Sequence, residues 1–423
     1  MNITILPGQL HGAIDAIPSK SQAHRSLICA ALADRPTRIE CGIESGDISA
    51  TVACLRALGS DIKHDIGGYT VSPLAPMPAK PAVLPCGESG STFRFMLPIT
   101  GALGRSASFI PLGRLPERPI SPLYEELMQH GCLLSPQGSV PFHCSGHLQP
   151  GNYSLDAGIS SQFISGLLLA LPLLDGDSEL LLTGCVESYP YIEMTLAMLN
   201  VFRVEIEFDG VVFSIPGGQE YHSPGVVNVE GDWSNAAFWL GAGAIGAGSV
   251  SCVGLDMHSR QGDRAIIDIL KKFGARVEFD DSAVTVSGGK LHGTEIDARD
   301  TPDLVPITAV VAAAAEGFTV IRNAGRLRDK ESDRLAAITE MMRRAGADVT
   351  ETDDGLLICG GAALTGGHVS SRGDHRISMA AAIMATLCTA PVEISGAESV
   401  GKSYPGFFDD LQMLGGKISK RGV

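Results

Sequence analysis

The feature that most constrains the fold is a sixfold internal repeat. Six segments of helix length, apolar on every face, each follow a short run of small or polar residues. A helix that is hydrophobic all round must be buried, so six buried helices are expected. They begin near Ser21, Ser91, Ser161, Ser234, Asp303 and His375, at steps of 70, 70, 73, 69 and 72 residues. Six such units account for nearly all of the 423 residues.

Each unit also contains a second, amphipathic helix that usually ends at a glycine and continues into a strand. The clearest copies cover 264–279 and 334–349, where apolar residues recur at helical spacing before Gly274 and Gly346. The copy at 192–204 lacks the glycine. The unit is therefore predicted to run β-α-β-α-β-β, with one buried and one half-exposed helix. The length favours two domains of three units each, in an α/β protein.

Charge and composition exclude several classes of protein. The formal net charge of −15 opposes non-specific binding to nucleic acid or to a membrane surface. With 44% hydrophobic and 19% charged residues, a compact chain is expected rather than a disordered one. The ten cysteines are scattered, without a Cys-x-x-Cys pair or zinc spacing, which predicts reduced thiols and no metal site. Residues 1–18 predict a strand and a turn without the basic region of a signal peptide, so we expect a cytoplasmic protein.

Basic residues gather at the predicted starts of the buried helices. Lys20 and Arg25 flank the first start, where the helix dipole disfavours cations unless an anion binds there. Guanidinium groups bind phosphate and carboxylate through two parallel hydrogen bonds. Seven cations would meet if the helix starts face one cleft: Lys20, Arg25, Arg118, Lys330, Arg334, Arg376 and Lys402. They predict a focused site for substrates that carry several negative charges.

Each of these segments also has a purely structural interpretation. The polar run 160–162 and Asp303 are of the residue types that cap helix N-termini. The charged run 330–334 could be a solvated turn, and the arginines of the loop 111–119 could be exposed. The glycine-containing turn at 86–94 could cradle phosphate, but such turns are common. Taken singly, the segments leave both interpretations open.

Together, the motifs resemble those of the 5-enolpyruvylshikimate 3-phosphate synthase family over the full length of the chain. They are Lys20-Ser21 with Arg25, Gly90-Ser91 with Arg94, Glu117-Arg118-Pro119-Ile120, Ser160-Ser161-Gln162, Pro302-Asp303, Lys330-Glu331-Ser332-Asp333-Arg334, Asp374-His375-Arg376 and Lys402. The resemblance implies two inside-out α/β barrel domains, each of three β-α-β-α-β-β repeats. Domain I would comprise 1–18 and 231–423, and domain II 19–230, with the active site in the cleft between them.

The resemblance also implies the reaction. The family transfers the enolpyruvyl group of phosphoenolpyruvate to the 5-hydroxyl of shikimate 3-phosphate and releases phosphate, in the pathway to chorismate and the aromatic amino acids. It uses no metal or organic cofactor. The expected shikimate 3-phosphate ligands, mainly from domain II, are Lys20, Ser21, Arg25, Ser160, Ser161, Gln162, Ser188, Asp303 and Lys330. The expected phosphoenolpyruvate ligands, mainly from domain I, are Lys20, Gly90, Arg118, Gln162, Arg334, Arg376 and Lys402.

Three residues are candidates for proton transfer in an addition–elimination reaction through a tetrahedral intermediate. Asp303 is the candidate base for the hydroxyl, and Glu331 is the candidate acid for the methylene carbon of phosphoenolpyruvate. Their roles would reverse in the elimination, and Lys20 would assist. Because ligands come from both groups of repeats, domain closure is expected to complete the site. A monomer without nucleic-acid or membrane partners is expected.

Three residues depart from the family's pattern, and three other families are alternatives. Glu88 and Phe95 lie near Gly90, and Arg326 stands where some members have an asparagine that contacts the sugar phosphate. Enolpyruvyl transferases acting on UDP-N-acetylglucosamine typically carry a cysteine in the loop that corresponds to 111–119, which has none here. An RNA-phosphate cyclase would need a nucleophilic histidine, for which the candidate is His375. A nucleic-acid clamp or other non-catalytic scaffold is the remaining alternative, and the charge of −15 argues against the clamp.

Overall fold

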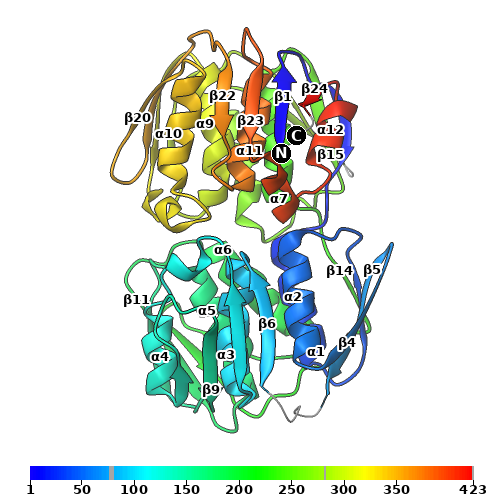
Figure 1. The fold of residues 1–423 in the computed structure, drawn as a ribbon, viewed down its shortest axis with the longest axis vertical. Coiled ribbons are helices and arrows are strands. Elements are labelled where there is room, and N and C mark those ends of the chain that lie inside the picture. Colours follow the sequence, from blue (N-terminus) through cyan, green and yellow to red (C-terminus); the bar gives the residue numbers. More distant parts are fainter. Residues whose placement is uncertain (76–80, 281–282, 422–423) are drawn as a thin grey trace. The chain divides into compact units, whose positions relative to one another are not determined.

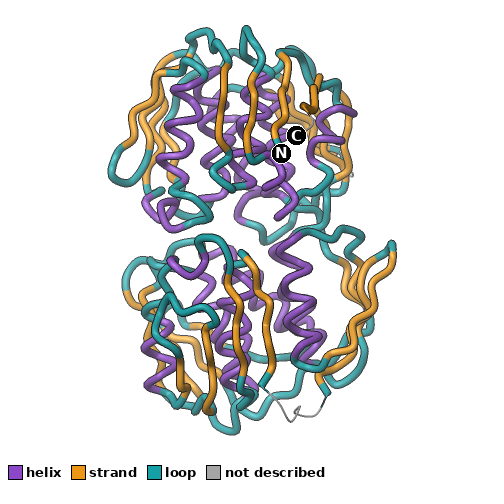
Figure 2. The backbone as a smooth tube through the Cα atoms, in the orientation of Figure 1, coloured by secondary structure: helices purple, strands orange, loops and turns teal. Residues whose placement is uncertain are grey.

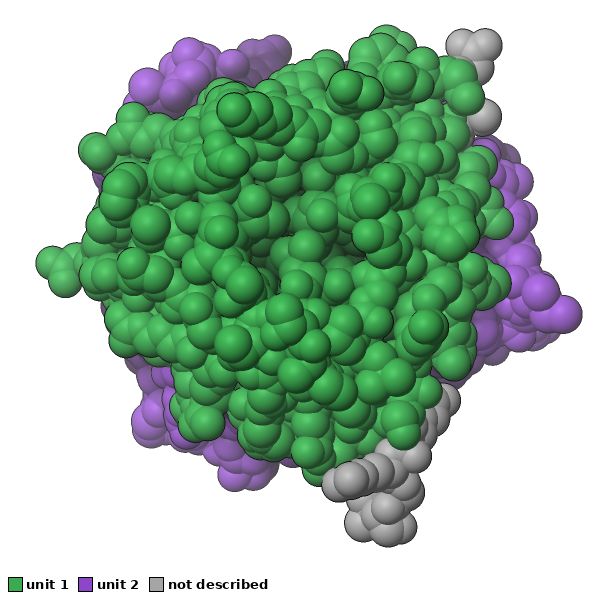
Figure 3. Space-filling view, turned by 90° about the horizontal axis from the view of Figure 1, so that it is seen from above, with its two compact units in different colours: residues 1–19, 230–423 green, residues 20–229 purple. Residues whose placement is uncertain are grey.

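The computed structural model describes residues 1–75, 81–280 and 283–421 (Figure 1). The chain forms two compact units, which Figure 3 colours separately. Unit 1 comprises Met1–Ser19 and Glu230–Val423, and unit 2 comprises Lys20–Val229. Each unit has its own core of buried apolar side chains. In the part of the chain that the structure describes, no helix combines the length and the apolar character that crossing a membrane requires.

Unit 2 contains three copies of the predicted β-α-β-α-β-β repeat. Its elements in chain order are α1 (Lys20–Leu32), β3 (Thr37–Glu40), α2 (Gly46–Ala57), β4 (Ser60–Asp65), β5 (Gly68–Leu74), β6 (Ala82–Gly87), α3 (Gly90–Ala102), β7 (Ala107–Pro111), α4 (Leu123–Gln129), β8 (Cys132–Leu134), β9 (Phe142–Gly146), β10 (Asn152–Asp156), α5 (Ser161–Ala170), β11 (Ser178–Thr183), α6 (Tyr189–Val201), β12 (Glu207–Phe208), β13 (Val212–Ile215) and β14 (Val226–Asn228). The first copy receives its leading strand from the end of the unit, because β14 pairs in parallel with β3.

Unit 1 contains the other three copies. Its elements are β1 (Asn2–Leu6), β2 (Gly12–Asp15), α7 (Trp233–Ile245), β15 (Ser249–Val253), α8 (Ile266–Phe273), β16 (Arg276–Phe279), β17 (Ala283–Ser287), β18 (Glu295–Asp297), α9 (Val305–Ala314), β19 (Gly317–Arg322), α10 (Arg334–Arg344), β20 (Asp348–Glu351), β21 (Leu356–Gly360), β22 (Gly367–Ser370), α11 (His375–Ala385), β23 (Val392–Ser395), α12 (Phe407–Met413) and β24 (Lys417–Arg421). Six short 3₁₀ helices complete the two units: η1 (Leu115–Glu117), η2 (Leu171–Leu173), η3 (Gly262–Ala265), η4 (Pro302–Leu304), η5 (Gly325–Asp329) and η6 (Ala397–Lys402).

The first 18 residues differ from the prediction of a single strand. They form two strands, β1 and β2, which join different sheets. β2 pairs in parallel with β15, whereas β1 lies antiparallel between β23 and β24. Pro7 directly follows β1, and proline ends a strand because it has no N–H to donate to the ladder. The N-terminal segment therefore completes the first and the last sheet of unit 1.

All six sheets share one topology of four strands. Their orders are β14-β3-β5-β4, β6-β7-β9-β8 and β10-β11-β13-β12 in unit 2, and β2-β15-β17-β16, β18-β19-β21-β20 and β22-β23-β1-β24 in unit 1. In each sheet the first two strands are parallel and the other pairs are antiparallel. In the four sheets that start with β6, β10, β18 and β22, the two parallel strands precede the two helices of one repeat, so both helices start at the same edge of their sheet. β2 and β14 instead continue into α1 and α7 of the other unit.

The strands lie on the outside of each unit and the buried helices lie inside (Figure 2), so each unit is an inside-out α/β barrel. Helices α3, α9 and α11 are buried along nearly their whole length, as their apolar sequences predict. Glycine lets two of the inner helices approach closely. A Cβ on Gly166 of α5 would lie 2.5 Å from the carbonyl oxygen of Arg94 in α3.

The amphipathic helices end at a residue in the left-handed region of backbone conformation. Gly274 after α8 has φ 97° and Gly346 after α10 has φ 88°. The copy without a glycine keeps the same geometry, because Arg203 after α6 has φ 60°. The repeat therefore imposes this turn even where the residue type disfavours it.

Candidate active site

The predicted site residues come from two equivalent connections in each repeat. One connection leads from the first strand into the buried helix, and the other leads from the second strand into the amphipathic helix. Because these two strands are parallel, both connections lie at the same end of the unit. Gly90, Ser161, Asp303 and Arg376 belong to the first kind of connection. Arg118, Ser188, Lys330, Glu331 and Lys402 belong to the second kind.

In unit 1 these residues meet around Arg334, the first residue of α10. Its side chain is 2% exposed and contacts three carboxylates. Nε donates to Asp374 Oδ2 at 2.8 Å, Nη1 to Asp303 Oδ1 at 2.8 Å, and Nη2 to Glu331 Oε2 at 2.6 Å. Burial disfavours the charged guanidinium, but the three carboxylates outweigh it and hold the pKa of Arg334 above its usual value. Arg334 therefore stays cationic.

Asp303 is held by a second arginine. Arg376 Nη2 donates to Asp303 Oδ2 at 2.7 Å, so the two carboxylate oxygens each face a guanidinium. Burial alone would raise the pKa of Asp303, but Arg376, Arg334 and Lys330 outweigh that effect and hold the pKa well below its ordinary value. Asp303 lies within η4 rather than at an N-cap position, so the simple capping interpretation is wrong. Its carboxylate is a proton acceptor of low basicity while both arginines remain bound.

Glu331 and Lys402 complete the group. Lys402 Nζ lies 3.6 Å from Glu331 Oε1, and Glu331 binds Arg334 through its other oxygen. The side chain of Glu331 is 14% exposed and that of Lys402 is 9% exposed. Lys330 directly follows η5 and acts on Asp303 through its charge. The run 330–334 is thus part of an ion-pair network rather than a solvated turn.

Two acidic residues in unit 1 were not predicted as part of the site. Asp374 caps α11 by accepting from Arg376 N at 2.9 Å, and it also orients Arg334. Asp263 in η3 is 1% exposed and accepts a hydrogen bond from Ser234 Oγ. Burial and the charge of Asp303 raise the pKa of Asp263 to about 7. The only sequence signal for Asp374 was its place in the Asp-His-Arg motif, and Asp263 gave none.

In unit 2, Lys20 lies at the start of α1 and pairs with an unpredicted carboxylate. Lys20 Nζ lies 2.7 Å from Asp47 Oδ2, at side-chain exposures of 15% and 8%. Asp47 is in the first turn of α2, where an acidic residue is common because it favours the helix dipole. Because acidic residues are common at this position, the sequence did not identify Asp47 as a partner of Lys20.

A second group in unit 2 surrounds Gly90, the first residue of α3. A Cβ at Gly90 would lie 2.8 Å from Nη1 of both Arg118 and Arg94, so a side chain there would require the two guanidinium groups to shift. Arg94 donates to Gln162 Oε1 at 2.9 Å and to Pro119 O at 3.0 Å. Gln162 Nε2 in turn donates to Ser91 Oγ at 2.9 Å. The predicted ligand Gln162 thus forms one hydrogen-bonded group with Arg94 and Ser91 of the preceding repeat, neither of which was predicted as a ligand.

Arg25 is a buried side chain whose guanidinium donates hydrogen bonds within its own unit. It is 2% exposed and donates to Thr195 Oγ1 at 2.8 Å, to Ser21 O at 2.7 Å and to Tyr191 O at 2.9 Å. Burial lowers the pKa of Arg25 to about 10. Arg25 therefore ties α1 to α6, next to Ser188, which has φ 55°. A serine in the left-handed region is strained, and such strain is frequent at functional sites.

The helix starts themselves are partly capped by side chains. Ser160 Oγ accepts from Gln162 N at 3.3 Å, Ser89 from Thr92 N at 3.3 Å, and Asp232 from Asn235 N at 2.8 Å. Ser160 is therefore the N-cap of α5, and its role as a ligand stays a prediction.

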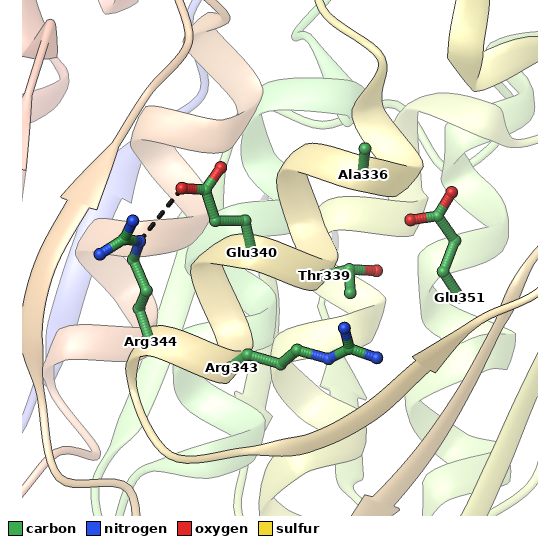
Figure 4. Close-up of a pocket in the computed structure, with 6 residues that line it drawn as sticks. All are labelled: Ala336, Thr339, Glu340, Arg343, Arg344 and Glu351. Atoms are coloured by element: carbon green, nitrogen blue, oxygen red, sulfur yellow. Dashed lines mark hydrogen bonds and ion pairs between the residues drawn. The ribbon is translucent and has the colours of Figure 1, made fainter.

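The arrangement of cations beside carboxylates suits anion binding and proton transfer. Within the described ranges, no group of three or more His, Cys, Asp or Glu side chains could hold a metal ion. The cavity of ≈ 450 Å³ in Figure 4 contains no predicted site residue; it is lined by Ala336, Thr339, Glu340, Arg343, Arg344 and Glu351. Arg344 and Glu340 pair along α10 at 3.1 Å, whereas Glu351 pairs with Arg328 and Arg343 donates to Val349 O at 2.9 Å.

Known proteins resemble the chain over its full length. Among solved structures, the enolpyruvyl transferase NikO from Streptomyces tendae shares the fold, with a TM-score of 0.81 at 20% identity. EPSP synthase from Acinetobacter baumannii matches with a TM-score of 0.83 at 26% identity, covering 99% of this chain and 100% of that one.

Sequence similarity is closer still. The 3-phosphoshikimate 1-carboxyvinyltransferase of Clostridium kluyveri is 41% identical over 423 residues, covering 100% of this chain and 99% of that protein. Its counterpart in Clostridium acetobutylicum is 43% identical over 422 residues, covering 98% of each. The family model described as EPSP synthase (3-phosphoshikimate 1-carboxyvinyltransferase) matches residues 6–411. The chain therefore belongs to the EPSP synthase family.

Proposed function

We propose that the residues described above carry out the family's reaction in an active site between units 1 and 2. The protein is a transferase of the shikimate pathway that transfers an enolpyruvyl group, and its family uses phosphoenolpyruvate and shikimate 3-phosphate. The observation that supports the proposal most strongly is the group of Arg334, Arg376 and Lys402 around Asp303 and Glu331. This group combines cations for two anionic substrates with two carboxylates for proton transfer.

Phosphoenolpyruvate is assigned to the more numerous cations, because its only polar groups are a carboxylate and a phosphate, whereas shikimate 3-phosphate also offers hydroxyl groups. Its proposed ligands are Lys20, Gly90, Arg118, Gln162, Arg334, Arg376 and Lys402. The guanidinium of an arginine matches either anion with two parallel hydrogen bonds. The contact of Arg118 with Gly90 supports a compact pocket, since a side chain at Gly90 would displace the guanidinium.

Shikimate 3-phosphate is assigned to the hydroxyl and amide groups of unit 2, together with residues of unit 1. Its proposed ligands are Lys20, Ser21, Arg25, Ser160, Ser161, Gln162, Ser188, Asp303 and Lys330. Serine and glutamine side chains suit the ring hydroxyl groups of shikimate, and the cations suit the 3-phosphate. The hydrogen bonds of Gln162 with Arg94 and Ser91 support a fixed amide orientation.

The chemistry is assigned to Asp303, Glu331 and Lys20. Asp303 takes the proton of the 5-hydroxyl as its oxygen bonds to C2 of phosphoenolpyruvate, and Glu331 protonates C3, which gives the tetrahedral intermediate. In the elimination Glu331 removes a proton from C3, the C2–O bond to phosphate breaks, and phosphate leaves with the proton held by Asp303. Lys20 assists the proton transfer. Holding both substrates together supplies much of the rate enhancement.

The ion pairs of Asp303 have a consequence for its role as a base. A substrate anion that binds Arg334 and Arg376 competes with Asp303 for the same guanidinium groups. Weakening these ion pairs raises the pKa of Asp303, because the two arginines are what lower it. Substrate binding would therefore activate the base at the moment that the hydroxyl is present.

The experiment that tests the function measures phosphate release from phosphoenolpyruvate with each acceptor. We expect release with shikimate 3-phosphate and no release with UDP-N-acetylglucosamine or with phosphoenolpyruvate alone. Release with the nucleotide sugar only would assign the chain to the other enolpyruvyl transferase. A matched assay of Arg334→Gln should lose turnover, whereas Arg322→Gln, on the exposed end of β19, should retain it.

We further propose that the enzyme is a cytoplasmic monomer. Eight cysteines are buried as thiols without a disulfide, which fits a reducing compartment. The formal charge of −15 favours solubility without self-association. Light scattering over a range of protein concentrations would detect a dimer.

A further inference from the structure

A chain of buried polar side chains links the first turns of three helices in unit 2. Its members are Ser89, the N-cap of α3, and His24, Thr51 and Thr92 on α1, α2 and α3, each no more than 1% exposed. Thr51 Oγ1 is the central atom, 2.7 Å from His24 Nδ1 and 2.7 Å from Thr92 Oγ1. Thr92 Oγ1 donates to Ser89 Oγ at 2.8 Å. None of the four residues was predicted to belong to the site.

The hydroxyl groups determine which atom is the donor and which is the acceptor in each of these hydrogen bonds. Because Thr92 donates its proton to Ser89, its oxygen accepts from Thr51. Thr51 has then used its own proton, so it accepts from His24 Nδ1. In this arrangement His24 carries a proton on Nδ1. Burial lowers the pKa of His24 to about 3, which keeps the ring neutral at physiological pH. His24 Nε2 is buried without a hydrogen-bond partner among the described residues.

These four hydrogen-bonded side chains lie directly beneath the proposed substrate-facing residues. His24 is four residues after Lys20 on α1, and Thr51 is four residues after Asp47 on α2, so each pair shares a helix face. Lys20 and Asp47 are joined by an ion pair of 2.7 Å. On α3, Thr92 follows two residues after Gly90. One of these hydrogen-bonded side chains thus lies one layer below each of the three helix starts and supports it.

A buried polar network is a costly way to fill a core. Apolar side chains of similar volume would pack there without the desolvation penalty, and stability alone does not favour the hydroxyls. Directional hydrogen bonds instead permit only one arrangement of the three helices. We propose that Thr51, with His24 and Thr92, is a positioning residue that fixes Lys20 relative to Gly90 for enolpyruvyl transfer. This inference rests on the proposed role of Lys20 in binding both substrates.

The test compares two variants of Thr51 that differ in one group. Thr51→Val replaces the hydroxyl with a methyl group of the same shape, and Thr51→Ser keeps the hydroxyl. We expect Thr51→Val to lower kcat/KM for phosphoenolpyruvate by about 10-fold to 100-fold, at a temperature where all variants are folded. Thr51→Ser should recover most of this loss.

A matched control lies on α3, the helix that also carries Thr92. Thr100 is as fully buried as Thr51, and its hydroxyl donates to Met96 O at 2.7 Å. Thr100→Val makes the same chemical change away from the helix start and should keep the wild-type kcat/KM. If Thr51→Val does not fold, His24→Asn against His24→Leu provides the same comparison, since only asparagine retains a donor near Nδ1.

A double-mutant cycle separates positioning from general damage. If Thr51 acts through Lys20, Thr51→Val should change the affinity for shikimate 3-phosphate, measured by calorimetry, far less in a Lys20→Met background than in the wild type. Equal losses in both backgrounds, or a wild-type kcat/KM for Thr51→Val, would overturn the inference. Wild-type protein that releases no phosphate with shikimate 3-phosphate would instead refute the proposed function, so the two failures are distinct.

Discussion

Arg334 contacts three carboxylates of its own chain, and Arg376 shares one of them. Asp303, Glu331 and Asp374 balance the charges of Arg334, Arg376 and Lys402. Breaking such a buried network by removing one partner is costly, because the remaining charge loses its compensation. At the scale of residues, the site is thus a set of internal ion pairs for which an anionic substrate must compete.

Asp303 is the residue for which this arrangement makes the sharpest kinetic prediction. Asp303→Ala should turn over at least about a hundredfold slower, given the usual size of general-base effects. It should still bind shikimate 3-phosphate, because the other proposed ligands remain. Steady-state kinetics and calorimetry measure the two quantities, with Glu316→Ala, an exposed residue, as the control. Near-normal turnover of Asp303→Ala would remove this residue from the role of base.

His24 predicts a pH dependence of stability. Burial lowers its pKa from 6.5 to about 3. Between these values the unfolded chain binds a proton that the folded chain does not, so the free energy of unfolding falls as the pH falls. The slope approaches about 1.4 kcal/mol per pH unit.

The variant His24→Asn keeps a donor near Nδ1 but does not titrate. As the pH is lowered from 6.5 towards 3, the free energy of unfolding of the wild type should therefore fall relative to that of His24→Asn, by about 1.4 kcal/mol per pH unit. Urea denaturation at several pH values measures the difference. A difference that stays constant with pH would contradict the neutral buried ring.

At the scale of elements, the buried and amphipathic helices follow from local patterns in the sequence. The predicted starts at Ser161, Ser234 and His375 fall within one residue of the observed helices α5, α7 and α11. The split of 1–18 into two strands was missed because their pairing partners lie hundreds of residues away. Asp47 was missed for a similar reason, since its tie to Lys20 exists only after two helices have packed.

The residue of positive φ that follows each amphipathic helix, usually a glycine, gives a stability prediction. Gly274 has φ 97°, and a Cβ there would lie 2.6 Å from Lys290 O, so Gly274→Ala should lower the free energy of unfolding by more than about 1 kcal/mol. Arg203 already occupies the equivalent position at φ 60°. Arg203→Gly relieves this strain, so it should be neutral or stabilising by up to about 1 kcal/mol. Thermal unfolding of both variants measures the contrast, and a destabilising Arg203→Gly would contradict the shared turn.

At the scale of the whole molecule, six copies of one unit build two barrels that share a single topology. The repeat places most of the proposed ligands at or just before the starts of its helices, and the copy that contains α7 and α8 supplies none of them. The period of about 70 residues predicted the six copies and their division into two groups of three, whereas the inside-out barrels were implied by the family resemblance. That the ligands of both units act together is our proposal, and it rests on the joint placement of the motifs rather than on any local pattern.

The most direct test of the central claim is a crystal structure of the enzyme with shikimate 3-phosphate and phosphate in place of the donor. We predict one shikimate 3-phosphate molecule that contacts Ser161 or Gln162 of unit 2 and also Asp303 or Lys330 of unit 1, with Arg334 beside the phosphate. A shikimate 3-phosphate molecule whose contacts are confined to one unit would contradict the claim that both units form a single cationic site.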